Sequence, residues 1–275
     1  MEYREASGWL KEADALLICA GAGMGVDSGL PDFRGDEGFW RAYPQARRLG
    51  MNFVDLANPA RFEENPSLAW AFYGHRLQLY RQTRPHRGFS ILLKLAMEMD
   101  DYFVFTSNVD GQFQKAGFPD ERIYECHGSI HYLQCTSCER EIWSAEGLEI
   151  DIDFEAFRAL NPPLCPDCHA VARPNILMFS DWGYRSERSD IGRRAFEEFL
   201  GRISQRGRTL AIVEIGAGSA VPTVRMTSES IARSMNAKVL RINPREPHID
   251  PSLGWGLPVG GLEGIESLVK MAEKL

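Results

Sequence analysis

The chain has 275 residues, a formal net charge of −7 and 44% hydrophobic residues. This length can bury a sizeable core in one large domain or two smaller ones, and the acidic balance excludes a general attraction to nucleic acid or anionic membranes. No apolar run could span a bilayer and residues 1–5 do not resemble a signal peptide, so we expect a cytoplasmic protein whose six cysteines are thiols or metal ligands.

The first elements expected are a helix over residues 3–14 and a short buried strand over residues 15–20. Gly21 and Gly23 follow the strand directly and permit a tight turn that brings backbone N–H groups close to a ligand. A helix starting within residues 26–30 would direct its N-terminus at the same place, which favours a pyrophosphate. A dinucleotide fingerprint would need a third glycine where Val26 stands, so a plain strand-to-helix turn stays open.

A longer pattern begins at the first of these glycines. It resembles the cofactor-binding loop of the sirtuins, the NAD-dependent protein deacylases, which reads nearly G-A-G-I-S-x-x-S-G-I-P-D-F-R. The matching residues are Gly21, Ala22, Gly23, Ser28, Gly29, Pro31, Asp32, Phe33 and Arg34. Gly25 departs from the family, which usually has serine there. The resemblance implies that NAD is bound by Gly21, Ala22, Gly23, Asp32, Phe33 and Arg34.

Residues 36–66 are rich in aromatic side chains and favour short helices and loops, and residues 68–83 favour one longer helix. Tyr73 and Arg76 lie three residues apart and share a face of that helix. They resemble the Tyr-x-x-Arg pair with which some sirtuins bind acidic acyl groups such as succinyl. Arginine can form a fork onto a carboxylate, and tyrosine adds a hydroxyl. An ordinary amphipathic helix with a packed tyrosine and a solvated arginine remains the alternative.

A helix is expected over residues 88–99 and a buried strand over residues 102–105, and polar side chains follow that strand. Such a strand end is where open α/β sheets bind ligands. The segment resembles the sirtuin T-Q-N-I-D motif, which implies that Ser107, Asn108 and Asp110 surround the ribose and the nicotinamide. Ser107 replaces the usual glutamine, and Gln112-Phe113 replaces a usual Leu-His pair. These departures change the expected shape of the pocket.

A strand is expected over residues 122–125, and Cys126-His127-Gly128-Ser129 comes next. It matches the sirtuin H-G-S motif, and the resemblance implies that His127 is the general base. A histidine suits this role because its unperturbed pKa lies near neutrality.

Two C-x-x-C pairs predict a metal site. Two such pairs can supply four thiolates to one tetrahedral zinc ion, which leaves no position for water and implies a structural role. Redox pairs or free thiols are the alternative. Acidic residues between the pairs argue against a nucleic-acid-binding zinc ribbon. The ligands expected are Cys135, Cys138, Cys165 and Cys168.

The remaining matches return to the expected sheet. Residues 172–181 resemble the sirtuin strip that pairs with the substrate peptide, a contact that a sheet edge can make through its backbone. A strand over residues 209–215 leads to a second glycine turn, where sirtuins have G-T-S, and a strand over residues 238–242 leads to Asn243, which resembles the family's I-N. The resemblance implies NAD contacts from Gly216, Ala217, Gly218, Ser219 and Asn243.

We therefore expect an α/β fold, with a Rossmann-like, mostly parallel sheet and a smaller discontinuous domain that contains the four-cysteine zinc ribbon. The expected boundaries are 1–35, 81–126 and 175–275 for the NAD-binding domain, and 36–80 and 127–174 for the small domain.

The resemblance implies NAD-dependent removal of acyl groups from lysine side chains of proteins or peptides, with His127, Asn108 and Asp110 in the reaction. The same pocket could transfer ADP-ribose to a protein or hydrolyse NAD. A non-catalytic NAD-binding sensor also stays open, because of the departures at Ser107, Gln112 and Ala217.

Overall fold

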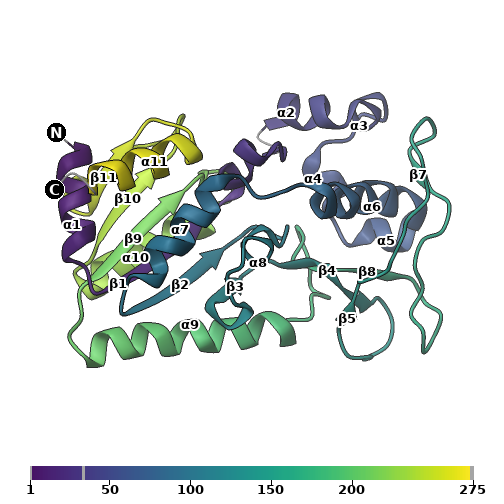
Figure 1. Ribbon diagram of the computed structural model, residues 1–275. Coiled ribbons are helices and arrows are strands. Elements are labelled where there is room, and N and C mark those ends of the chain that lie inside the picture. Colours follow the sequence, from purple (N-terminus) through teal and green to yellow (C-terminus); the bar gives the residue numbers. More distant parts are fainter. Residues whose placement is uncertain (1, 33–34, 273–275) are drawn as a thin grey trace.

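The computed structural model describes residues 2–32 and 35–272 and has a larger and a smaller lobe (Figure 1). The predicted contacts of Phe33 and Arg34 fall outside the described residues. Within the described part of the chain, no helix is long and apolar enough to cross a membrane.

The larger lobe is built on a six-stranded sheet in which every pairing is parallel. The strand order is β11-β10-β9-β1-β2-β3, so the chain leaves β1 toward one edge and later builds outward from β9 to the other. This reversal brings the carboxyl ends of β1 and β9 together, the place where such sheets bind ligands. The strands are β1 (Ala15–Ala20), β2 (Asp101–Thr106), β3 (Ile123–Glu125), β9 (Leu210–Ile215), β10 (Lys238–Ile242) and β11 (Gly254–Leu257).

Helices cover both faces of this sheet because alternate residues of β1 point to opposite sides. Leu16 and Ile18 pack with α1, α7 and α11, whereas Ala15 and Leu17 pack with α9 and α10. Both faces are fully buried, which explains the continuous apolar run of this strand. The covering helices are α1 (Glu2–Glu12), α7 (Arg87–Met97), α9 (Glu187–Gln205), α10 (Thr223–Met235) and α11 (Gly261–Ala272).

The smaller lobe combines helices and a three-stranded sheet around an aromatic core. Its longest helix, α6 (Pro66–Gln82), begins at Asn65, whose side chain accepts a hydrogen bond from the N–H of Leu68. The sheet pairs β4 (Gly128–Cys135) antiparallel with β8 (Ala172–Ile176) and β5 (Trp143–Ser144). The other elements are α2 (Gly35–Ala42), α3 (Pro44–Arg48), α4 (Phe53–Leu56), α5 (Ala60–Glu64), β6 (Ile152–Asp153) and β7 (Arg158–Ala159).

The predicted α/β architecture is confirmed, but the helix expected to start within residues 26–30 is wrong. A 3-10 helix, η1 (Ala22–Ser28), begins directly after the first glycine and ends where that helix was expected to start. Gly29 adopts a left-handed φ of 87° and donates its N–H to carbonyls of η1, which stops the helix. Two short elements follow β2, namely α8 (Gln112–Lys115) and η2 (Asp120–Arg122).

Candidate active site

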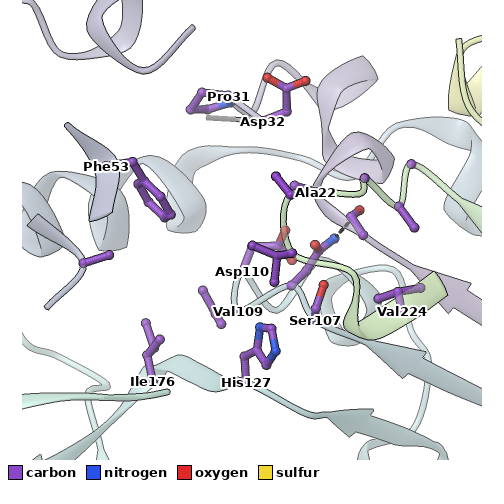
Figure 2. A pocket seen from close by; sticks show the side chains of 18 of the residues that line it. Ala22, Pro31, Asp32, Phe53, Ser107, Val109, Asp110, His127, Ile176 and Val224 are labelled. Atoms are coloured by element: carbon purple, nitrogen blue, oxygen red, sulfur yellow. Dashed lines mark hydrogen bonds between the residues drawn. The ribbon is translucent and has the colours of Figure 1, made fainter. Parts of the chain in front are cut away.

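A cavity of about 870 Å³ is lined by residues of both lobes (Figure 2). The segments that follow β1, β2, β3 and β9 all reach it, so it lies at the carboxyl end of the sheet. The residues of the sequence hypothesis that line it are Gly21, Ala22, Asp32, Tyr73, Arg76, Ser107, Asn108, Asp110, His127, Gly216, Ala217, Gly218 and Ser219.

The two glycine turns form one wall of the cavity by packing backbone against backbone. The Gly23 N–H donates to the Gly216 carbonyl over 3.0 Å. A Cβ added at Gly21 or Gly23 would lie 2.7 or 2.6 Å from a Cα of the other turn, and Gly216 has a positive φ of 64°. Any side chain at these positions would therefore separate the turns. The contact between the two turns therefore requires glycine at Gly21, Gly23 and Gly216. The sequence pattern of the loop does not reveal this requirement.

Asn108 and Asp110 are held in place by the ends of β1 and β2. The Asn108 side chain donates to the Gly21 carbonyl over 3.0 Å, and its backbone N–H donates to Oγ1 of Thr106. Asp110 accepts a hydrogen bond of 2.9 Å from the Gln112 N–H, yet burial raises the pKa of this carboxyl to about 6.

His127 lies between the end of β3 and the start of β4, and its imidazole lines the cavity near Ser107 and Asp110 (Figure 2). Its Nε2 lies 3.3 Å from Oγ1 of Thr223, the first residue of α10. Burial lowers the pKa of His127, so the neutral imidazole that can accept a proton is favoured at neutral pH.

Tyr73 and Arg76 come from α6 in the smaller lobe and also line the cavity. Both are buried, with exposed fractions of 1% and 6%. The expectation of a shared helix face fits these positions, whereas a solvated arginine does not. His75 points elsewhere, because its Nδ1 lies 2.9 Å from the Tyr43 hydroxyl.

Among the predicted cofactor residues that the structure describes, Gly23 and Asn243 do not line the cavity. Gly23 belongs to the first turn but is not among the lining residues, and Asn243 is fully buried, where its side chain donates to the Ala217 carbonyl over 2.7 Å. Asn243 thus supports the second glycine turn from behind. Its neighbours Arg245 and Glu246 reach the cavity instead, and Glu246 accepts hydrogen bonds from the N–H and hydroxyl of Ser219. Only their position just after a strand end could have pointed to them.

The four predicted metal ligands gather in the smaller lobe. All four sulfur atoms lie within 4.8 Å of one another, with the Sγ atoms of Cys135 and Cys168 3.4 Å apart and those of Cys138 and Cys165 3.6 Å apart. A tetrahedron with metal–sulfur bonds of about 2.3 Å has sulfur atoms about 3.8 Å apart. The donor set therefore fits one zinc ion, with no place left for water or substrate.

The sequence pattern of the Sir2 family matches residues 21–192, more than half of the chain. The chain belongs to the Sir2 family. This confirms the sirtuin resemblance, and the match includes the first glycine turn, Asn108, Asp110 and His127.

Curated relatives of this Sir2 protein are similar over most of their length. A protein of Aquifex aeolicus named NAD-dependent protein deacylase is 29% identical over 234 residues, which cover 85% of each chain. A protein of the same name from Thermus thermophilus is 28% identical and covers 96% of this chain and 93% of its own.

Solved Sir2 structures share the fold. A Sir2 homologue in complex with NAD has a TM-score of 0.74 at 23% identity, with 98% of this chain and 93% of the other covered. A Sir2 complex with a deacetylated p53 peptide and 3′-O-acetyl ADP-ribose has a TM-score of 0.68 at 21% identity, with 98% of each chain covered.

Proposed function

We propose that this Sir2 protein uses NAD to remove acyl groups from lysine side chains of proteins, giving nicotinamide and O-acyl-ADP-ribose. The observation that carries the proposal is the convergence of His127 and the Asn108–Asp110 segment with both glycine turns on one cavity. Relatives of similar length named NAD-dependent protein deacylase support the same reaction.

In this proposal each group of residues has a separate role. The glycine turns, with Asp32 and Ser107, hold NAD, which supplies the ribose that takes up the acyl group. Asn108 and Asp110 position the ribose and nicotinamide. His127 is the general base that removes a proton from a ribose hydroxyl, and its lowered pKa keeps it unprotonated at neutral pH. The four cysteines hold zinc, which keeps the small lobe folded and takes no part in the reaction.

We further propose that Tyr73 and Arg76 bind the carboxylate of an acidic acyl group such as succinyl. Both residues line the cavity and come from α6. A guanidinium remains charged when buried, so it favours an anionic over a neutral acyl group. The lobe boundaries expected from the sequence and a cytoplasmic location also remain proposals.

A panel of acetyl-, succinyl- and long-chain acyl-lysine peptides with NAD tests the function through nicotinamide release. Mass spectrometry then separates the alternatives, because deacylation gives O-acyl-ADP-ribose, transfer gives ADP-ribosylated protein, and hydrolysis gives free ADP-ribose. We expect release that requires an acyl-lysine peptide. NAD binding without release from any peptide would favour the sensor instead.

A further inference from the structure

The guanidinium of Arg76 lies within a group of aromatic rings. Its Cζ is 5.2 Å from the ring centre of Phe72, 5.3 Å from that of Tyr80, 5.5 Å from that of Tyr73 and 6.0 Å from that of Phe53. Ring faces carry partial negative charge and stabilise a cation away from water. The guanidinium is thus kept charged inside the cavity wall rather than at the protein surface.

Tyr80 makes a second, directional contact with this guanidinium. It lies one helical turn after Arg76 on α6, the spacing that brings side chains together. Its hydroxyl oxygen accepts hydrogen bonds from both Nε, over 3.0 Å, and Nη2, over 2.7 Å. These bonds fix the rotation of the guanidinium plane.

The hydrogen of the Tyr80 hydroxyl must then point away from Arg76. A tyrosine oxygen that accepts two N–H groups can still donate its own hydrogen to another acceptor. Burial raises the pKa of Tyr80, so the hydroxyl keeps this hydrogen at neutral pH. Tyr80 also lines the cavity, which places this donor beside any group that enters it.

The backbone of Tyr80 is anchored from the sheet lobe. Its carbonyl accepts a hydrogen bond of 2.7 Å from Nζ of Lys115 in α8. This helix begins two residues after Asp110, in the segment that carries the proposed ribose and nicotinamide contacts. The position of Tyr80 is therefore tied to the same segment of chain as the reaction site.

We infer that Tyr80 is a specificity-determining and positioning residue: it holds the Arg76 guanidinium in a fixed orientation and donates its own hydroxyl to the carboxylate of an acidic acyl group. The inference rests on the proposed deacylase function and deepens it. An acetyl group ends in a methyl group and offers neither charge nor acceptor to this pair. A fixed cation with a neighbouring hydroxyl donor loses little conformational freedom when a carboxylate binds.

The test is a Tyr80→Phe variant, which removes only the hydroxyl. Its kcat/KM for a succinyl-lysine peptide, divided by that for an acetyl-lysine peptide, is expected to fall about tenfold, mainly through KM of the succinyl peptide. Tyr102→Phe is the matched control, because it removes a tyrosine hydroxyl near the start of β2, away from the cavity, and its ratio should not change. If Tyr80→Phe is unstable, Arg76→Lys, which keeps the charge and loses the fork, is expected to lower the ratio similarly.

An unchanged ratio, or equal losses for both peptides, would overturn the role of Tyr80. So would a wild-type protein that releases nicotinamide with acetyl-lysine but does not act on succinyl-lysine. If no acyl peptide gives nicotinamide, the deacylase function fails separately, and calorimetry still tests Tyr80. The succinyl peptide should then bind wild-type protein with ADP-ribose about tenfold more tightly than the Tyr80→Phe variant, and equal affinities would contradict the inference.

Discussion

Two buried carboxylates of the larger lobe have contrasting surroundings. Glu214 lies in the middle of the sheet, in β9, where both of its oxygens are bound by Arg241 over 2.5 and 3.0 Å and where the Ser228 hydroxyl also donates to it. Asp110 lies at the cavity, and among the described residues no cation stands within ion-pair distance of it. Its pKa rises to about 6 because burial outweighs its backbone hydrogen bonds and the more distant Arg76 and Lys115.

The difference separates the groups that support the fold from those available to a ligand. Burying a charge is tolerated when a partner and hydrogen bonds compensate it, as at Glu214. Within the described part of the chain, the Asp110 carboxyl has no cation at ion-pair distance, whereas Glu214 in the same lobe has Arg241. A buried group without a charge partner has a perturbed pKa, and such groups are common at functional sites. Changes at the cavity should therefore lower activity without lowering stability, and changes to the paired charges in the sheet should lower stability.

The largest effect is expected from His127→Ala. Removal of a general base should lower the rate of NAD-dependent deacylation by about 10² to 10⁴-fold. The variant should fold and keep zinc, because the hydrogen bond that it loses is the one between the imidazole and the Thr223 hydroxyl. Steady-state assays, thermal melting and zinc content measure these outcomes. Deacylation near the wild-type rate would show that His127 is not the base.

The second effect is on stability and concerns the sheet. Glu214→Ala removes the carboxylate that binds the buried Arg241 through two hydrogen bonds and leaves Glu229 as its remaining partner, so it should destabilise the protein by about 3 kcal/mol in urea unfolding. Glu198→Ala, at an exposed position of α9, is the control and should change stability by less than about 0.5 kcal/mol. Similar losses in the two variants would remove the contrast between the sheet and the cavity.

The third effect is an increase in the free energy of unfolding, the opposite of the effect of Glu214→Ala. Asp110→Asn should stabilise the protein by about 3 kcal/mol at pH 8, because the folded state disfavours the ionised carboxyl. The pKa of this acid is higher in the folded than in the unfolded chain, so its ionisation costs stability as the pH rises from about 4 through about 6. The gain should thus shrink to less than about 1 kcal/mol at pH 4. Unfolding measured at both pH values checks this, and an equal gain at each would exclude ionisation as its cause.

Much of the fold followed from local patterns in the sequence. Of the strands next to the glycine turns, β1 is a continuous apolar run and β9 is apolar apart from Glu214. The two C-x-x-C pairs have the spacing of zinc ligands. The Asn108, Asp110 and His127 positions came from motifs in family order. Local signals suffice for these features because each depends on residues that are near in sequence.

Other features depend on partners far along the chain and could not be predicted. The pairing of β4 with β8 joins residues about 40 apart, and the Glu214–Arg241 pair joins two strands. Asn243 has the side chain of a ligand-binding residue, but the neighbouring turn uses its hydrogen bonds. The role of Tyr80 was also hidden, since one tyrosine in an aromatic helix resembles any packed side chain.

The close approach of the two glycine turns has a mechanical consequence. Because no side chains separate the turns, the backbone segments at the carboxyl ends of β1 and β9 are in direct contact. We therefore expect this wall of the cavity to be rigid when a ligand binds. Substrates of different size should therefore be accommodated by movements of the helices and loops of the smaller lobe.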